Sequence, residues 1–137
     1  MPDALLTHPT PGLRRAIEMA LDGARIQSAG GSPVVVTFDE VHNFFFQFAP
    51  GDAEGELIGE IVGQDCLAPV DRRTPGQLAR LRAAGWTLAP AADEHPNHSR
   101  VWALDRTSLA EAIRETATLA FEVFGYDGRP VDIQIVR

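Results

Sequence analysis

Hydrophobic and polar residues alternate with a period of two in three neighbouring runs of the sequence. The runs are "PVVVTFD" at 33–39, "NFFFQFAP" at 43–50 and "ELIGEIVG" at 56–63. This period is that of a β-strand, whose successive side chains point to opposite faces of a sheet. Only "EVH" separates the first two runs, and the turn-rich "PGDAEG" separates the second from the third. Short connections of this kind join antiparallel neighbours, so the pattern predicts a three-stranded meander.

A helical period follows Thr10 and Pro11, two residues that are typical of a helix start. The apolar residues that share one face of this helix are Leu13, Ile17, Ala20, Leu21 and Ala24. Gly30 and Gly31 are expected to end the element. Residues 1–9, which precede the helix, are expected to form a flexible N-terminal tail.

Two further helices begin at capping sequences. The stretch "TPGQ" at 74–77 combines an N-cap, a first-turn proline and a capping-box partner, and Gly85 is expected to end that helix. Ser108 with Glu111 offers a second capping box, and Gly125 is expected to end the helix that it opens. The predicted buried stripe of this last helix comprises Leu109, Ile113, Ala117, Ala120 and Phe124.

Three shorter runs are also typical of strands: "WTLA" at 86–89, "SRVWALD" at 99–105 and "PVDIQIV" at 130–136. Trp86 and Trp102 can each bury a large area, so we interpret them as core anchors. The inward residues of the last run are predicted to be Val131, Ile133 and Ile135. The complete order is a helix, three strands, a helix, two strands, a helix and a strand. This order predicts an α+β fold with a mostly antiparallel sheet and helices packed on one face, as a single domain over residues 10–137.

The strand pattern divides the sheet residues between two faces. Phe44, Phe46 and Phe48 share one face with apolar residues of the neighbouring runs, and the first and third helices can cover it. The other face is half apolar, which is more consistent with contact to another chain than with free solvent. An exposed strand edge could also accept an added strand from a client polypeptide. The predicted partner-binding residues on the outer face are Val35, Phe45, Gln47, Ile58, Glu60 and Val62.

Charge and composition narrow the functional classes. The 137-residue chain has a formal net charge of −7, whereas nucleic-acid binders carry a basic footprint, so nucleic acid is not an expected partner. All 12 basic residues are arginine, and four of them lie in the segment "DRRTPGQLARLR" at 71–82. This segment is either a solvated helix face or a contact for an acidic partner.

The sequence also favours a cytoplasmic protein without membrane contact. No apolar run approaches the ~20 residues that a membrane span needs. The N-terminus lacks the basic and continuous apolar regions of a signal peptide. The single Cys66 cannot form an internal disulfide, which fits a reducing compartment.

One loop offers metal-ligand chemistry. The stretch "DEHPNH" contains Asp93, Glu94, His95 and His98, which could hold zinc or another divalent ion. Its spacing matches no helical zinc motif, and polar loops contain such residues by composition. No phosphate-binding glycine loop or nucleophile elbow is present, and Cys66 has no histidine close in sequence to activate it. We therefore predict a non-enzymatic protein without catalytic residues, cofactor or metal, and keep a small metal-dependent enzyme or regulator at this loop as the alternative.

Several motifs together resemble a known superfamily. "FFFQFAP", a turn, "GELIGEIVG", a helix ending "LRAAGW", then "NHSRVW" and a last helix ending "FEVFGY" occur in that order. This arrangement resembles the type III secretion chaperone-like and YbjN-like (TY-Chap) superfamily, especially its actinobacterial members. The resemblance covers roughly residues 11–127. The matching positions are Phe46, Gln47, Phe48, Leu57, Glu60, Val62, Leu81, Gly85, Trp86, Asn97, Trp102, Phe124 and Gly125.

The resemblance implies a helix, a meander, a second helix, further strands and a packing helix. It also implies binding of a protein or peptide client without catalysis, commonly as a homodimer. An immunity or antitoxin-type protein that binds one toxin is a further alternative, since the acidic charge would complement a basic target.

Overall fold

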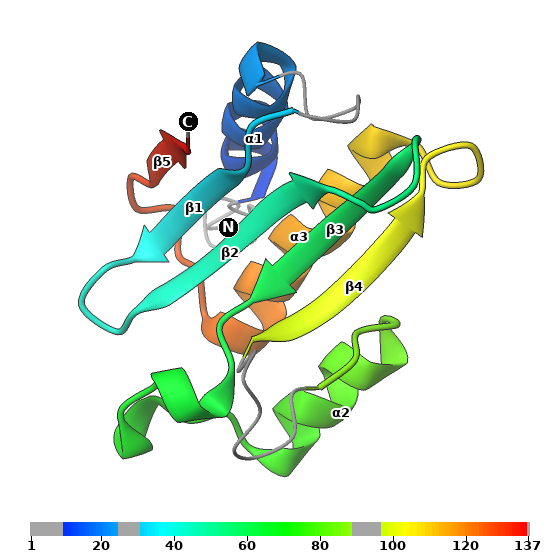
Figure 1. Cartoon of the computed structure of the whole chain (residues 1–137). Helices are drawn as coiled ribbons and strands as arrows, with labels where there is room; N and C mark the ends of the chain where they lie inside the picture. The colour runs from blue at the N-terminus through cyan, green and yellow to red at the C-terminus, as the bar shows by residue number, and fades with distance from the viewer. Residues whose placement is uncertain (1–9, 25–30, 89–96, 137) are drawn as a thin grey trace, which may run out of the picture.

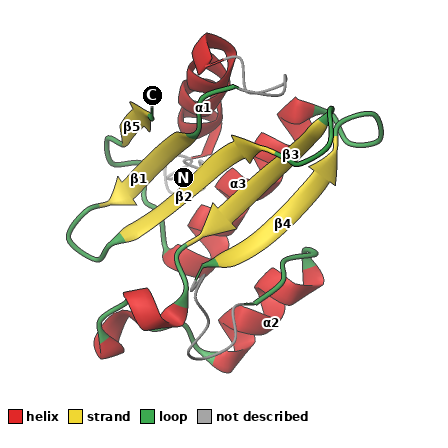
Figure 2. Cartoon of the chain, viewed as in Figure 1, coloured by secondary structure: helices red, strands yellow, loops and turns green. Residues whose placement is uncertain are grey.

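The computed structural model describes residues 10–24, 31–88 and 97–136 and shows an α+β fold (Figure 1; Figure 2). A five-stranded sheet is combined with three α-helices and two short 3₁₀ turns within these ranges. The elements are α1 (Thr10–Ala24), β1 (Val34–Asp39), β2 (Phe44–Pro50), β3 (Glu56–Ile61), η2 (Gln64–Cys66), η3 (Pro69–Asp71), α2 (Pro75–Ala83), β4 (His98–Ala103), α3 (Leu109–Phe124) and β5 (Asp132–Ile135).

The sheet has the strand order β4-β3-β2-β1-β5, and each neighbouring pair is antiparallel. The predicted meander is confirmed, since β1, β2 and β3 are adjacent in sequence and in space. The β1–β2 turn is tight enough to place Asn43 at a φ of 59°, in the left-handed region that asparagine tolerates. The later strands extend the meander at its two edges, with β4 beside β3 and β5 beside β1.

Helices α1 and α3 lie on one side of the sheet, behind it in the view of Figure 1. Helix α2 lies beside the start of β4 and packs against α3. The core fills the space between the sheet and the two covering helices. From β2 it takes Phe44, Phe46 and Phe48, which are at most 5% exposed, as the alternation predicts. We call this side of the sheet the covered face and the opposite side the open face.

The predicted starts of α2 and α3 are confirmed at their caps, whereas α1 begins at Thr10 itself and is described as far as Ala24. The Thr74 hydroxyl accepts a hydrogen bond from the Gln77 N–H, and the Gln77 side chain accepts one from the Thr74 N–H, which completes a capping box. The Ser108 side chain caps α3 by accepting from the Glu111 N–H at 3.2 Å. Gly125 ends α3 at a φ of 70°, a conformation that glycine adopts without strain.

The strand predicted from "WTLA" is wrong for Trp86 to Leu88, the part that the structure describes. Only Thr87 pairs there, through an isolated bridge to Ser99 of β4. The Trp86 N–H donates to the Leu81 carbonyl at the end of α2, so this backbone group closes the helix and cannot join a ladder. The side chain of Trp86 is nevertheless 2% exposed, in agreement with its predicted role as a core anchor.

Gly59 makes room for both tryptophans on the covered face. A Cβ atom at this position would lie 2.6 Å from the ring of Trp102 and 3.2 Å from the ring of Trp86. The two indoles meet edge to face, with centroids 5.8 Å apart and planes at 86°. The Trp102 Nε1–H donates to the Glu115 carboxylate at 3.1 Å, which satisfies its buried polar group and joins β4 to α3.

Candidate functional site

The open face is the candidate functional site, and strand register arranges its side chains in rows across the sheet. Residues opposite each other in neighbouring antiparallel strands point to the same face. An apolar row contains Val101, Ile58 and Ala49, which are register partners across β4, β3 and β2. A polar row next to it contains Ser99, Glu60, Gln47, Val35 and Gln134. A third row contains Phe45, Thr37 and Asp132. No described helix covers these rows, which face the viewer in Figure 1.

Five of the six predicted partner-binding residues belong to the open face. These residues are Val35, Phe45, Gln47, Ile58 and Glu60, and each is partly exposed. The prediction is wrong for Val62, which is 1% exposed and belongs to the hydrophobic core. The assigned strand β3 ends at Ile61, and the chain enters η2 at Gln64, so Val62 lies where the sheet meets this turn and is covered there. The Val62 N–H donates to the Phe45 carbonyl at 3.2 Å, which holds this turn against β2.

Phe45 lies on the open face but is less accessible than the sequence suggested. Its side chain is half-buried and packs against the edge of the core cluster. A large apolar side chain that is more accessible on the open face is Val101, which is 55% exposed. Val136, directly after β5, is 49% exposed. Sequence reasoning missed Val101 and Ala49 because their rows depend on strand register, which the sequence pattern did not establish.

The open face carries acidic but no basic side chains at its described strand positions. Glu60 is fixed by a hydrogen bond from the Gln47 side-chain amide to its carboxylate, 2.8 Å long. Glu56 lies at the start of β3, where its carboxylate accepts from the Ala53 N–H at 3.0 Å. Asp132 is exposed at the start of β5. Among the strands that the structure describes, only β4 contains an arginine, Arg100. Its guanidinium lies over the Trp102 ring, 5.2 Å from the ring centroid, and donates to the Ala84 carbonyl.

The two edges of the sheet differ in their availability. At the β4 edge, Thr87 exchanges both main-chain hydrogen bonds with Ser99, at 2.7 and 3.0 Å. The Ala103 carbonyl further along is occupied by the N–H groups of the following turn. At the β5 edge, the Val136 N–H donates to the Pro33 carbonyl at 2.8 Å. Every second residue of β5, counted back from Val136, therefore directs its main-chain groups toward β1. The N–H and C=O groups of Ile133 and Ile135 therefore point away from β1, toward the outer edge.

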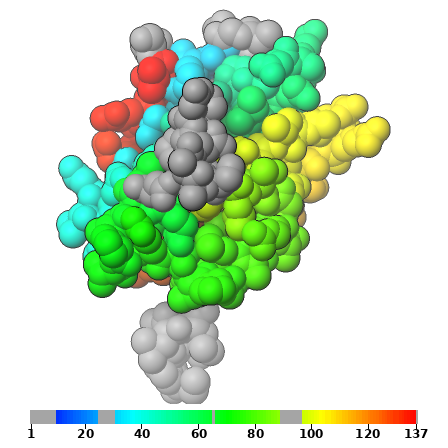
Figure 3. Space-filling model, turned by 60° about the horizontal axis from the view of Figure 1, so that its bottom comes forward, coloured from blue at the N-terminus to red at the C-terminus, as the bar shows by residue number. Residues whose placement is uncertain are grey.

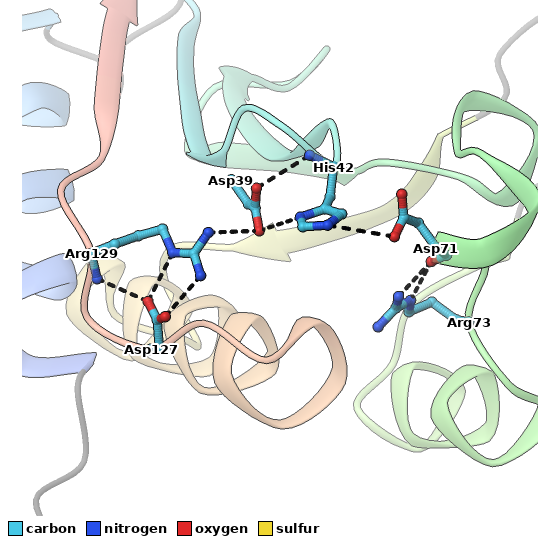
Figure 4. A network of polar contacts seen from close by, with 6 residues as sticks. All are labelled: Asp39, His42, Asp71, Arg73, Asp127 and Arg129. Atoms are coloured by element: carbon cyan, nitrogen blue, oxygen red, sulfur yellow. Dashed lines mark hydrogen bonds and ion pairs between the residues drawn. The ribbon is translucent and has the colours of Figure 1, made fainter.

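A polar network holds the end of the sheet where β1 turns into β2 (Figure 4). The Arg129 guanidinium donates to Asp39 at 3.0 Å and pairs with Asp127 at 2.8 Å. Asp39 also accepts from the His42 N–H at 3.2 Å and lies 2.8 Å from the His42 ring. The other ring nitrogen of His42 lies 3.9 Å from Asp71 in η3. The network therefore connects the β1–β2 turn to η3 and to the segment before β5.

Local charges shift the acidity of this network. Burial alone would raise the pKa of Asp39, but hydrogen bonds from His42 and the charge of Arg129 outweigh it and lower that pKa. Hydrogen bonds from Arg129 hold the pKa of the exposed Asp127 far below its ordinary value. Both carboxylates are thus ionised and paired near neutral pH. The arrangement fits a structural clamp, because its carboxylates are engaged by neighbouring groups of the same chain.

The arginines of the basic segment at 71–82 differ in their surroundings: some contact other parts of the chain, and others are exposed to solvent. The Arg73 guanidinium lies over the rings of Phe44 and Phe124, at 4.8 and 5.3 Å from their centroids, and donates to the Val123 carbonyl at 2.8 Å. Arg80 pairs with Glu122 of α3 at 2.7 Å. Arg72 is exposed, as is Arg82. In Figure 3, where the bottom of the view in Figure 1 comes forward, the green segment from η2 to α2 forms much of the lower part of the visible surface.

A pocket of about 280 Å³ lies between α2 and α3 on this basic side. Its lining residues are Arg80, Ala84, Arg114, Glu115, Thr118 and Leu119. Two of its charged groups are already engaged within the chain, since Arg80 pairs with Glu122 and Glu115 accepts from Trp102. Arg114 is the third charged residue of the lining, and it alone has no ion-pair partner among the described residues.

Of the four residues in the suggested metal-binding loop, only His98 lies within the part of the chain that the structure describes. His98 is 2% exposed at the start of β4, and burial lowers the pKa of its ring. Asp93, Glu94 and His95 lie outside the described residues. Within the described ranges, no group of three or more His, Cys, Asp or Glu residues could hold a metal ion. Cys66 is half-buried in η2, and its carbonyl accepts from the Asn43 side chain at 3.0 Å.

Comparison with known proteins gives no match from which a function could be inferred. No protein-family model, no curated protein and no solved structure matches the chain. None of the helices in the described ranges is long and apolar enough to cross a bilayer. The functional argument therefore depends on the open face, its charge and the two sheet edges.

Proposed function

We propose that this protein is a non-enzymatic, chaperone-like module that binds a client polypeptide on the open face of its sheet. The observation that carries the proposal is a sheet covered by α1 and α3 on one side, with partly exposed apolar residues on the other. Exposed apolar side chains that lie in a register row form a continuous surface, and such surfaces mark contact sites. The resemblance of the sequence to the type III secretion chaperone-like superfamily supports the same class of function.

The open face fits a polypeptide better than a small molecule. Binding sites for small molecules are concave, whereas this site is the surface of a sheet with its side chains in parallel rows. Contacts would come from Ile58 and Val101 in the apolar row and from Glu60 and Gln47 in the polar row. Side-chain rows of this kind can hold segments that share a pattern but differ in sequence, as a chaperone requires. A cytoplasmic location is part of the proposal and agrees with the single cysteine.

A displayed library of random peptides tests client binding without assuming which client is bound. Selection on the wild-type protein is expected to enrich peptides that no longer bind Ile58→Glu, because the new carboxylate would interrupt the apolar row. Val41→Glu is the matched control, since Val41 is 86% exposed in the β1–β2 turn, outside the rows. The enriched peptides should bind this control normally. Enrichment of no peptide, or equal binding to Ile58→Glu, would contradict the proposed function.

The homodimer implied by the resemblance is proposed to form at the β5 edge. The β4 edge is occupied in part, at Ser99 by Thr87 and at the Ala103 carbonyl by the following turn, whereas Ile133 and Ile135 direct their main-chain groups outward. Two β5 strands related by a two-fold axis can pair antiparallel, with Ile133 of one copy opposite Ile135 of the other. This register places the two Gln134 side chains together and separates the two Asp132 carboxylates. The sheet would then continue across both subunits without like charges opposite each other.

Sedimentation equilibrium over a range of concentrations tests this arrangement. Ile135→Pro removes an outward N–H while the N–H groups that bond to β1 remain, so this variant is expected to be monomeric. Ile135→Ala is the control, because it loses the same side chain but retains the N–H, and it should still dimerise. A wild-type monomer at all concentrations, or equal association of the two variants, would exclude the β5 interface.

A further inference from the structure

We infer that the client segment bound by the open face carries basic side chains beside its apolar ones. This inference rests on the proposed function and assigns the chemistry of the partner. The open face presents Glu56, Glu60 and Asp132, and its described strand positions contain no arginine. The chain has 12 arginines, so the absence of basic residues from these rows is a property of the face and not of the composition.

The position of Glu60 makes it the principal contact for a cation. Its carboxylate is held by the Gln47 amide at 2.8 Å, in the polar row directly beside the apolar row. A carboxylate that is fixed before binding loses less side-chain entropy when it pairs with a guanidinium or ammonium group. Gln47 engages only part of the hydrogen-bonding capacity of the carboxylate, since two oxygens can accept about four bonds. The remaining lone pairs are available to a partner.

Charge also argues against a second copy of the chain as the occupant of this face. Stacking two open faces about a two-fold axis would bring two surfaces of the same sign together. Glu60 and Asp132 would then approach acidic residues without an arginine in the rows to compensate them. Juxtaposed like charges disfavour such a contact. The open face is therefore assigned to a different polypeptide, while the β5 edge remains the proposed contact between copies.

The register also gives the spacing that a client must match. Ile58 and Glu60 are two residues apart in β3, and a strand rises about 3.4 Å per residue, which separates them by about 7 Å along the strand. A client therefore needs an apolar side chain and a basic side chain about this distance apart. An extended segment achieves this with residues two apart, and a helix with residues four apart. The inferred client pattern is thus an apolar and a basic residue two positions apart in an extended segment, or both kinds on one helical face.

Three synthetic peptides of equal length provide the direct test. Each has valine at every fourth position and serine at every second one, and the residue two positions after each valine is arginine in the first peptide, glutamine in the second and glutamate in the third. We expect the arginine peptide to bind wild-type protein at least about tenfold more tightly than the glutamate peptide. Its affinity should fall as salt is raised, because the contact is partly exposed and screened. Fluorescence anisotropy of labelled peptides measures all three affinities under the same conditions.

Because the whole chain is acidic, a matched pair of variants separates the open face from a general charge effect. Glu60→Gln and Glu18→Gln each remove one negative charge, and Glu18 is exposed on α1, on the other side of the sheet. Glu60→Gln is expected to weaken binding of the arginine peptide about fivefold, whereas Glu18→Gln should leave it unchanged. Equal effects of the two variants, or no preference among the peptides, would overturn the inference.

The library selection tests whether the open face binds a client, and the peptide affinities test whether that client is basic, so the two proposals can fail independently. Selected peptides that depend on Ile58 but show no excess of arginine or lysine would retain the proposed function and overturn the charge inference. Selected peptides that are enriched in basic residues and weakened by Glu60→Gln support both. If the arginine peptide fails to bind wild-type protein, the inference is wrong, and the selection alone then decides whether the open face binds a client.

Discussion

The covered face and the open face of the sheet are built from the same strands, yet they differ in almost every physical property. Phe45 and Phe46 are neighbours in β2, but Phe46 is fully buried whereas Phe45 is half-buried on the opposite side. The covered face contains tightly fitted aromatic rings under α1 and α3. The open face combines apolar rows with fixed carboxylates and is free of described helices.

This difference indicates which residues serve folding and which are available for binding. On the covered face, each side chain must fit its neighbours, as the contact of Gly59 with two indole rings illustrates. On the open face, side chains such as Val101 have solvent on one side and few packing constraints. Substitutions there can change recognition with little effect on stability, which makes the two faces separable by experiment.

The largest expected effect is on the covered face. Phe46→Ala is expected to lower the free energy of unfolding by about 3–5 kcal/mol, because it removes a fully buried ring and leaves a cavity. Phe45→Ala should lower it by about 1–2 kcal/mol, since less of its apolar area is buried. Urea denaturation followed by circular dichroism measures both values. Equal losses would mean that both faces of β2 act as core.

A smaller loss is expected where the covered face is already full. Gly59→Ala should destabilise by about 1–3 kcal/mol, because the added methyl group meets the ring of Trp102 at 2.6 Å. Gly23→Ala in α1 is the control, since a Cβ there has no neighbour within 4 Å and alanine favours a helix. The control should be stabilised by about 0.5–1 kcal/mol. Thermal denaturation of the two variants compares them, and a neutral Gly59→Ala would contradict the packing argument.

A more moderate effect is expected from His98, which is buried on the covered face and should make the free energy of unfolding depend on pH. Burial lowers the pKa of this histidine in the folded protein, whereas the unfolded chain has a pKa of about 6.5. Protonation therefore favours the unfolded state, so stability should fall as pH decreases below about 6.5. His98→Gln is expected to flatten the curve of unfolding free energy between about pH 6.5 and 5. His42→Gln should retain the fall, and a curve unchanged by His98→Gln would show that other groups cause it.

The smallest effect on stability is expected on the open face. Val101→Thr should change the free energy of unfolding by no more than about 0.5 kcal/mol, because its side chain is largely exposed. The same variant should nevertheless weaken binding of the arginine peptide, since it interrupts the apolar row. Val41→Thr is the control and should change neither property. A large loss of stability in Val101→Thr would show that the open face contributes to the core.

Much of the fold could be predicted because its signals are local. The capping sequences that begin α2 and α3 satisfy backbone groups within one helical turn, so they act wherever the helix lies. The alternation in β1, β2 and β3 correctly assigned Phe44, Phe46 and Phe48 to the core. The expected strand at Trp86 failed because its N–H closes α2, a competition between two partners that a strand pattern does not reveal.

The candidate site was only partly predictable because its composition depends on register and on strand ends. Val62 continues the alternating pattern of β3 in sequence, and its N–H bonds to the Phe45 carbonyl, yet the residue is buried at the end of the sheet. Val101 was absent from the predicted surface because nothing in its own run indicates that it pairs with Ile58. The contact between Gln47 and Glu60 likewise joins two strands whose relative shift determines which side chains meet.

The sequence by itself determined the three helices, the strands other than the one expected at Trp86, and the division of the meander strands into an apolar side and a mixed side, because these follow from the period of the backbone. Only the tertiary structure decided that β4 joins β3, that β5 covers the β1 edge and that Val62 is buried. It also decided that the acidic residues of separate strands share one face without an arginine. Those features depend on contacts between distant segments, and their energies appear only when the chain has packed.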